Sequence, residues 1–228
     1  MRALFIRNCL LCGAESRDDF CDPCRHDLPH LTRDHCMVCT LPLTGSRICG
    51  ACLANPPAFD RSVAALEYAF PVDALLHALK YQANLAMARV LADLLAARID
   101  PVDLPDRIVP MPLHSARLHE RGFNQALEIA RRVSKKTGVA LLPDVCQRVR
   151  DTPSQTGLPW KEREQNIRGA FTCETSLEGK HIAVLDDVMT TGSTLNELAK
   201  VLRKRGATRV SGWIVARTLP GASTTAVL

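Results

Sequence analysis

Residues 183–199 read AVLDDVMTTGSTLNELA and predict a strand, a turn and a helix in direct succession. The strand is a short apolar run that ends in two adjacent carboxylates, Asp186 and Asp187. A turn rich in hydroxyl groups follows, and it leads into a segment with the apolar spacing of an amphipathic helix. This order is typical of an α/β protein whose parallel strands are joined by helices.

The same stretch predicts a binding site for a phosphorylated sugar. Ligands of open α/β sheets bind beyond the carboxyl ends of the strands, and a helix N-terminus attracts anions. The two carboxylates suit vicinal hydroxyls, and Gly192 permits close approach of a phosphate. An ordinary helix cap at Ser193 or Thr194 would leave two costly buried carboxylates unexplained. The candidate ligand-binding residues are Asp186, Asp187, Val188, Met189, Thr190, Thr191, Gly192, Ser193 and Thr194.

The rest of the chain alternates between predicted strands and helices. Helices are expected at 72–99 (as one or two), 124–138 and 193–206, and strands at 62–70, 107–113, 141–149, 180–187 and 209–217. This alternation predicts a parallel sheet with helices on both faces. Residues 151–171 are polar, contain Pro and Gly, and form too long a segment for a simple connection, which is typical of a lid or a disordered loop.

Eight of the ten cysteines form four C-x2-C units within the first 52 residues. Two such turns complete a four-thiolate zinc site. The spacing allows sequential pairing of the units or a cross-braced arrangement. Either gives two closed, structural sites, and the metal would supply about 10–16 kcal/mol of apparent folding energy per site. The predicted ligands are Cys9, Cys12, Cys21, Cys24, Cys36, Cys39, Cys49 and Cys52, whereas Cys146 and Cys173 are expected to be core or edge residues without close partners.

Composition sets limits on location and partners. The 228 residues are 46% hydrophobic, but no apolar run has the roughly 20 residues of a membrane span. The apolar N-terminal stretch is interrupted by Arg7 and Asn8, so we predict no signal peptide and a cytoplasmic location, where thiols stay reduced. Two zinc ions on eight thiolates would lower the formal net charge of +5 to about +1. Nucleic-acid binding must therefore depend on local clusters of basic residues.

Several motifs extend these predictions by resemblance. The hydrophobic run, acidic pair and Thr-Thr-Gly of 183–192 closely resemble the phosphoribosyl-pyrophosphate (PRPP) motif of type I phosphoribosyltransferases. VPMPLHSARLHERGFNQA (109–126), TPSQTGLPWKEREQNIRGAF (152–171) and the C-x2-C units followed by NPPAFDRSVAALEYAFPVDALLHALKY (55–81) resemble the ComF family of competence-type proteins. The resemblance implies a double zinc ribbon at 1–55, before a Pro-Pro linker, and a type I phosphoribosyltransferase domain at 56–228.

The resemblance also implies roles for individual residues. Asp186 and Asp187 would bind the ribose hydroxyls, and residues 188–194 would bind the 5-phosphate. Met111–Leu113 takes the place of a pyrophosphate loop, although Pro110 and Pro112 remove two N–H donors there. The basic candidates for the phosphates are Arg117, Arg121, Lys80 and, in the expected lid at 151–168, Lys161 and Arg163.

Three functions follow from this resemblance. The first is a protein that binds PRPP with magnesium, or a ribose 5-phosphate group, and acts in DNA uptake with single-stranded DNA or a helicase-like partner of the competence machinery. The second is an active phosphoribosyltransferase with an unidentified acceptor, and the third is a PRPP-sensing regulatory module. No residue stands out as a general base, so the sequence leaves catalysis open. All three require that the acidic pair and the Thr-Thr-Gly turn form one pocket that salt bridges do not block.

Overall fold

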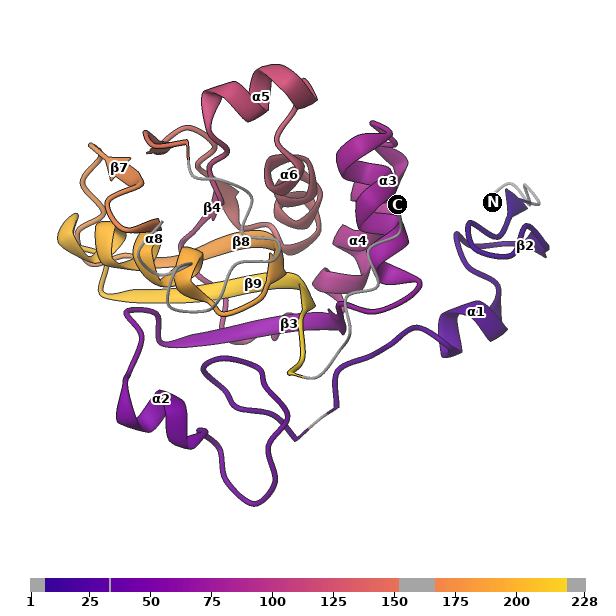
Figure 1. The fold of residues 1–228 in the computed structure, drawn as a ribbon, viewed down its shortest axis with the longest axis horizontal. Coiled ribbons are helices and arrows are strands. Elements are labelled where there is room, and N and C mark those ends of the chain that lie inside the picture. The colour runs from indigo at the N-terminus through magenta and orange to yellow at the C-terminus, as the bar shows by residue number, and fades with distance from the viewer. Residues whose placement is uncertain (1–6, 33, 152–166, 221–228) are drawn as a thin grey trace.

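The centre of the protein is a five-stranded, fully parallel sheet, as expected from the sequence (Figure 1). The computed structural model describes residues 7–32, 34–151 and 167–220. Across the sheet the strands follow the order β3-β9-β8-β4-β5. Their bounds are Arg61–Glu67 for β3, Arg209–Arg217 for β9, His181–Met189 for β8, Arg107–Pro110 for β4 and Ala140–Leu141 for β5.

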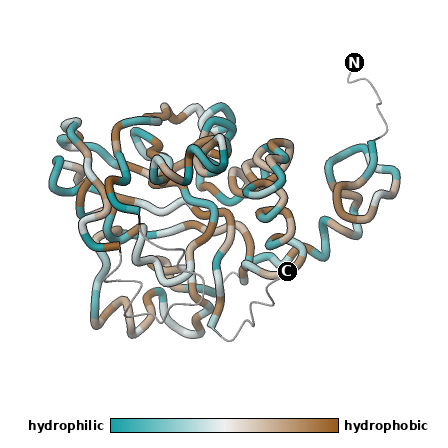
Figure 2. Tube along the Cα trace, turned by 45° about the horizontal axis from the view of Figure 1, so that its top comes forward, coloured by the Kyte–Doolittle hydropathy of each residue, from teal (hydrophilic) through white to brown (hydrophobic). Residues whose placement is uncertain are grey.

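The two central strands are buried on both faces, which explains their nearly continuous apolar sequences. Ile182 and Leu185 of β8 and Ile214 and Val215 of β9 have no exposed surface. Figure 2 shows the hydrophobic colour running along the strands and the helix sides that face them, with hydrophilic residues on the outer turns. The sheet therefore forms the core and holds its strand ends in fixed positions.

Helices cover both faces of the sheet. The predicted helical segment 72–99 forms two helices, α3 (Val72–Tyr81) and α4 (Ala86–Ala96). A further helix, α6 (Gln125–Thr137), packs against α4 and joins β4 to β5. The helix α8 (Ser193–Lys204) joins β8 to β9. In the strand order of the sheet, the step from β8 to β9 runs opposite to the step from β4 to β5. Right-handed crossovers therefore place α6 and α8 on opposite faces.

Two local predictions were wrong. The expected strand at 141–149 is two separate pieces: β5, and β6 (Cys146–Arg148), which pairs antiparallel with β7 (Phe171–Cys173) outside the main sheet. In this pairing Cys146 lies directly opposite Cys173, and both are buried, so the expectation that these cysteines lack close partners was also wrong. The intervening residues 152–166, which include Lys161 and Arg163, lie outside the described residues.

The N-terminal segment forms two small cysteine-containing lobes. The first contains β1 (Arg7–Asn8), β2 (Glu15–Ser16) and α1 (Asp22–His26) and stands apart from the sheet in both Figures 1 and 2. Its contact with the rest of the chain includes an Asp19–Arg89 ion pair with α4. The second lobe contains α2 (Gly50–Ala54) and lies against β3, where the Ser62 N–H donates to Met37 O at 3.0 Å.

Candidate functional site

The eight N-terminal cysteines form two four-sulfur clusters, made of Cys9, Cys12, Cys21 and Cys24 and of Cys36, Cys39, Cys49 and Cys52. Pairing is therefore sequential, and the cross-braced alternative is wrong. Within each cluster the sulfurs lie within 4.8 Å of one another, and Cys12–Cys21 and Cys39–Cys49 are 3.6 and 3.7 Å apart. Zinc–sulfur bonds of about 2.3 Å in a tetrahedron require similar spacings. Both clusters thus fit structural zinc.

The acidic pair lies at the carboxyl end of β8, and its two side chains have different environments. Asp187 is 4% exposed; its Oδ2 contacts Lys80 Nζ from α3, and its Oδ1 accepts from Gln125 Nε2 of α6 at 3.3 Å. Asp186 is partly exposed, and its Oδ1 accepts the Asp187 N–H at 2.8 Å. Asp187 is thus held by a cation, and Asp186 is the more accessible carboxylate.

These environments shift the two pKa values in opposite directions. Burial raises the pKa of Asp186 well above its ordinary value, and the neighbouring Asp187 charge raises it further. Burial alone would also raise the pKa of Asp187, but the Lys80 charge and the hydrogen bonds with Asp186, Lys80 and Gln125 together outweigh burial and lower it. Adjacent acids with separated pKa values are common at functional sites, because burying two like charges is tolerated where binding needs them.

The turn after the acidic pair has the geometry of an anion site. Gly192 is the N-cap of α8 with a φ of 81°, and glycine has no side chain with which to cap the helix. The Ser193 N–H donates to Thr191 Oγ1 at 3.2 Å, and the Thr191 and Ser193 hydroxyls lie 2.8 Å apart. The first turn of α8 therefore combines hydroxyl groups with the positive end of a helix. The N-cap is Gly192, so the helix cap considered at Ser193 or Thr194 is absent.

The two predicted arginines, Arg117 and Arg121, have different partners. Both belong to α5 (Ser115–Arg121), a helix that the sequence did not indicate. Arg121 donates from Nη1 to Gln125 Oε1 at 2.5 Å, which links it through Gln125 to Asp187, and it also lies 5.3 Å from the centre of the exposed Tyr81 ring. Arg117 lies beside Asp151, with its Nε 3.7 Å from Oδ1.

The sequence motifs did not identify three functional candidates: Gln125, Arg148 and Arg217. Burial and the neighbouring Arg117 lower the pKa of Arg148, whereas the charges of Asp186 and Asp151 oppose that shift. Arg217, at the end of β9, is 3% exposed and contacts the turn. The position of Arg217 at the end of an apolar strand could have indicated a buried polar role. The positions of Gln125 and Arg148 depend on tertiary contacts, so no sequence pattern marks them.

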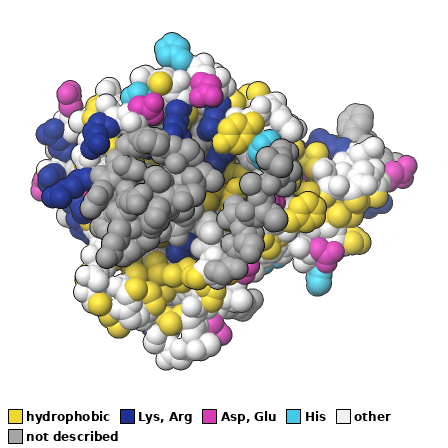
Figure 3. Space-filling model, in the orientation of Figure 1, with side chains coloured by type: hydrophobic (Ala, Val, Ile, Leu, Met, Phe, Trp, Pro, Cys, Tyr) yellow, Lys and Arg dark blue, Asp and Glu magenta, His cyan; other side chains and the backbone are white. Residues whose placement is uncertain are grey.

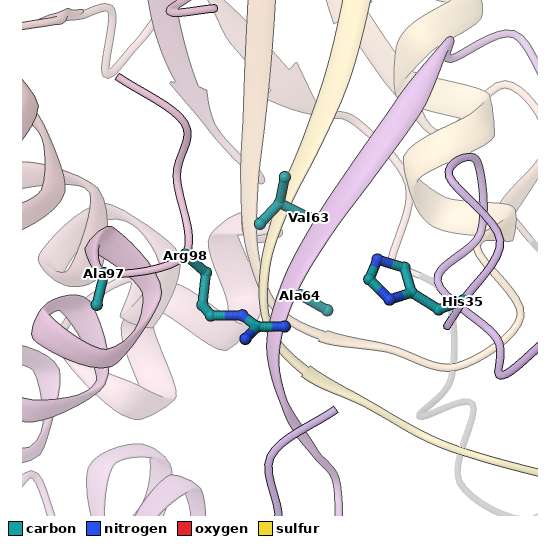
Figure 4. A pocket seen from close by; sticks show the side chains of 5 residues that line it. All are labelled: His35, Val63, Ala64, Ala97 and Arg98. Carbon is teal, nitrogen blue, oxygen red and sulfur yellow. The ribbon is translucent and has the colours of Figure 1, made fainter. Parts of the chain in front are cut away.

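A separate hollow of about 260 Å³ lies along the middle of edge strand β3, away from the carboxyl ends of the strands. Figure 4 shows Arg98 reaching toward Ala64 from the end of α4 and His35 standing on the side of the second cysteine lobe. The His35 ring is held by a 2.8 Å contact between Nδ1 and Thr32 O. Because this hollow lacks the acidic pair and the hydroxyl-rich turn, it is a different feature from the site at β8.

Comparison with family models agrees with this two-part arrangement. A double zinc ribbon domain matches residues 1–53, and a phosphoribosyl transferase domain matches residues 119–219. The second match contains α6, β8, the Thr-Thr-Gly turn and β9. No described helix is both long and apolar enough to cross a lipid bilayer.

Two curated relatives resemble most of the chain. DNA utilization protein YhgH of Escherichia coli K12 is 38% identical over 81% of this chain and 84% of its own length. Competence protein F of Haemophilus influenzae is 33% identical over 95% of this chain and all of its own length. Among solved structures, the glutamine PRPP amidotransferase of Bacillus subtilis matches with a TM-score of 0.38 and 20% identity, over 56% of this chain and 26% of that one.

Proposed function

Because the chain belongs to the ComF family, whose members join a double zinc ribbon to a phosphoribosyltransferase domain, we propose that it binds PRPP or a ribose 5-phosphate group and acts in the handling of DNA. The observation that carries the ligand is the proximity of Asp186 to the turn at Thr190–Ser193. The ribose hydroxyls would bind Asp186, and the 5-phosphate would bind the first turn of α8.

Lys80 has a defined part in this proposal. It pairs with the Asp187 carboxylate and favours its ionised form, which holds one positive charge beside the acidic pair. A bound pyrophosphate offers Lys80 a second anionic partner, and the magnesium that accompanies PRPP supplies further positive charge at the site. Gln125 donates to Asp187, and Arg121 donates to Gln125, so residues of α6 and α5 hold the Asp187 carboxylate in position.

Isothermal titration with PRPP and magnesium tests the ligand directly. We expect binding by the wild type, and a loss of at least about tenfold in affinity for Asp186→Asn, because the amide has one acceptor oxygen where the carboxyl group offers two for the vicinal sugar hydroxyls. Asp144→Asn, at an exposed position between β5 and β6, is the matched control and should bind normally. Absence of binding by the wild type would refute the ligand assignment.

A pyrophosphate-release assay with a panel of nucleobases separates turnover from binding alone. Turnover with any acceptor that disappears in Asp187→Asn would establish a transferase, because the reaction displaces pyrophosphate from the anomeric carbon. Binding without release would leave a PRPP-dependent binding or sensing role. Either result keeps the site assignment and decides between the functions that share it.

The names of the two relatives, DNA utilization protein and Competence protein F, support a DNA-related role. On the face shown in Figure 3, Lys and Arg side chains gather along the upper and left parts of the molecule. Exposed Arg150 and Arg168 lie next to each other, with Arg150 Nη1 donating to Arg168 O at 2.5 Å. Fluorescence anisotropy with a single-stranded oligonucleotide should show affinity that falls with salt and falls further in Arg150→Gln/Arg168→Gln. Salt-independent or absent binding would contradict a direct role with DNA.

A further inference from the structure

Arg217 connects the second cysteine cluster with the turn of the candidate site. The side chain is buried at the end of β9, and its Nε donates to Cys39 O at 2.8 Å. Its Nη1 faces three carbonyl oxygens on the other side, those of Met189, Thr190 and Thr218. One guanidinium thus contacts both the C-x2-C turn at Cys36–Cys39 and the chain entering the Thr-Thr-Gly turn.

The linker after the second cluster contacts the same turn independently. Ala58 N–H donates to Asn196 Oδ1 at 2.7 Å, and Arg203 Nε donates to Ala58 O at 2.8 Å, so both contacts hold the linker to α8. The buried Phe59 ring lies 3.7 Å from the position that a Cβ at Gly192 would occupy. The helix that supplies the anion site is therefore held by the segment that leaves the second cluster.

The electrostatics of the cluster support this arrangement. Four thiolates around one Zn²⁺ carry a net charge of about −2, and a buried guanidinium needs nearby negative charge or acceptors to offset its desolvation. A metal-loaded second cluster would therefore hold Arg217 in the position from which it supports the turn.

We infer that the second zinc ribbon stabilises the phosphate-binding turn, residues 189–194. Arg217 is the positioning residue that couples metal binding in this ribbon to the conformational order of the turn. The first ribbon does not share this role, since its described ion pairs with the rest of the chain run from Asp19 to Arg89 on α4. The inference about turn order needs no ligand; its consequence for affinity rests on the proposed binding of PRPP.

Hydrogen exchange of the ligand-free protein tests the inference, with zinc content measured in parallel. Cys49→Ser/Cys52→Ser should lose one zinc ion and raise exchange at 189–195 by about tenfold or more, because several hydrogen bonds to a charged group are released. Cys21→Ser/Cys24→Ser is the matched control and should also lose one zinc ion, with exchange at 189–195 unchanged. Equal protection of the turn in both double variants would overturn the inference.

Arg217→Lys addresses the same link without touching a metal ligand. Lysine keeps the charge but lacks the guanidinium fork, so we expect two bound zinc ions, faster exchange at 189–195 and unchanged exchange in β4. PRPP affinity should fall about tenfold in this variant and in Cys49→Ser/Cys52→Ser, and stay normal in the first-ribbon variant. If the wild type does not bind PRPP, the proposed ligand fails while the exchange result still decides the coupling. Unchanged exchange in Arg217→Lys would contradict the role of Arg217, even if the second-ribbon variant does not fold.

Discussion

Lys80 and Asp187 come from different elements, the last turn of α3 and the end of β8, and their charged groups are in direct contact inside the protein. The side chains are 20% and 6% exposed, so water screens the pair far less than a surface ion pair. Neither residue is stable there alone, because an unpaired buried charge is costly. The contact therefore fixes α3 relative to the sheet at the edge where the candidate ligand binds.

Removing the Lys80 charge should destabilise the fold strongly. In Lys80→Met a buried carboxylate loses its counter-ion, and we expect the free energy of unfolding to fall by about 3–5 kcal/mol. Adding Asp187→Asn should recover much of this loss, because no buried charge then remains unpaired. Lys136→Met is the matched control: its ion pair with Asp93 spans 2.9 Å but is exposed, so a change below about 1 kcal/mol is expected. Urea unfolding measures all three, and equal losses for the two lysines would contradict this account.

The raised pKa of Asp186 predicts an unusual pH dependence of stability. Between the ordinary carboxyl pKa near 4 and its raised value, the folded protein binds more protons at this position than the unfolded chain does, so this residue makes stability fall as pH rises. Asp186→Asn should therefore unfold at higher urea concentration than the wild type at pH 7 and show a smaller advantage at pH 4. Asp144→Asn should show no such difference. A destabilised Asp186→Asn protein at pH 7 would refute the assigned direction.

Asp187 should act in the opposite direction. Its lowered pKa means that its contribution to stability is present above the ordinary carboxyl pKa and is lost as pH falls through the lower, folded value. Asp186 thus lowers the stability of the fold at neutral pH, whereas the ionised Asp187 contributes to it. Retention of a destabilising acid is typical of a residue needed for binding.

Zinc content provides a test of the cysteine clusters themselves. We expect two zinc ions per chain by elemental analysis, since both clusters present four sulfurs at tetrahedral spacing. Titration with a thiol-modifying reagent should release both ions and lower the melting temperature, because metal binding and folding of such small lobes are coupled. Iron in place of zinc, or fewer than two ions in fully loaded protein, would contradict the assignment.

The main features of the fold could be predicted because they depend on local patterns. The apolar strands β8 and β9, the amphipathic helices and the C-x2-C spacing are each determined by neighbouring residues, and so the parallel sheet and the two cysteine lobes followed from them. The strand expected at 141–149 failed because Pro143 and Asp144 interrupt it: the first part pairs with β4, and Cys146–Arg148 pairs with β7 instead.

The candidate site was predictable only in part for a related reason. Asp186, Asp187 and the turn are contiguous in sequence, so their proximity required no tertiary information. Two partners change the chemistry of these groups from a distance in the sequence: Gln125 lies 62 residues from the Asp187 carboxylate that it contacts, and Arg217 lies 28 residues from the Met189 carbonyl that it contacts. Such contacts depend on how helices and strands pack, which no local motif specifies.

Gly192 offers a final test of the turn, because its positive φ is combined with crowding. A Cβ at this position would lie 2.8 Å from Met189 Cε and 3.7 Å from Phe59, whereas at Gly138, with a similar φ of 76°, nothing lies within 4 Å. Both Gly192→Ala and Gly138→Ala should cost about 1–3 kcal/mol in backbone strain. In Gly192→Ala, Met189 must also move next to the carbonyl that Arg217 contacts, so PRPP affinity should fall by about tenfold or more. Gly138→Ala, at the far end of α6, should bind PRPP normally. Titration calorimetry on the two folded variants decides the matter, and equal affinities would show that the turn does not hold the ligand.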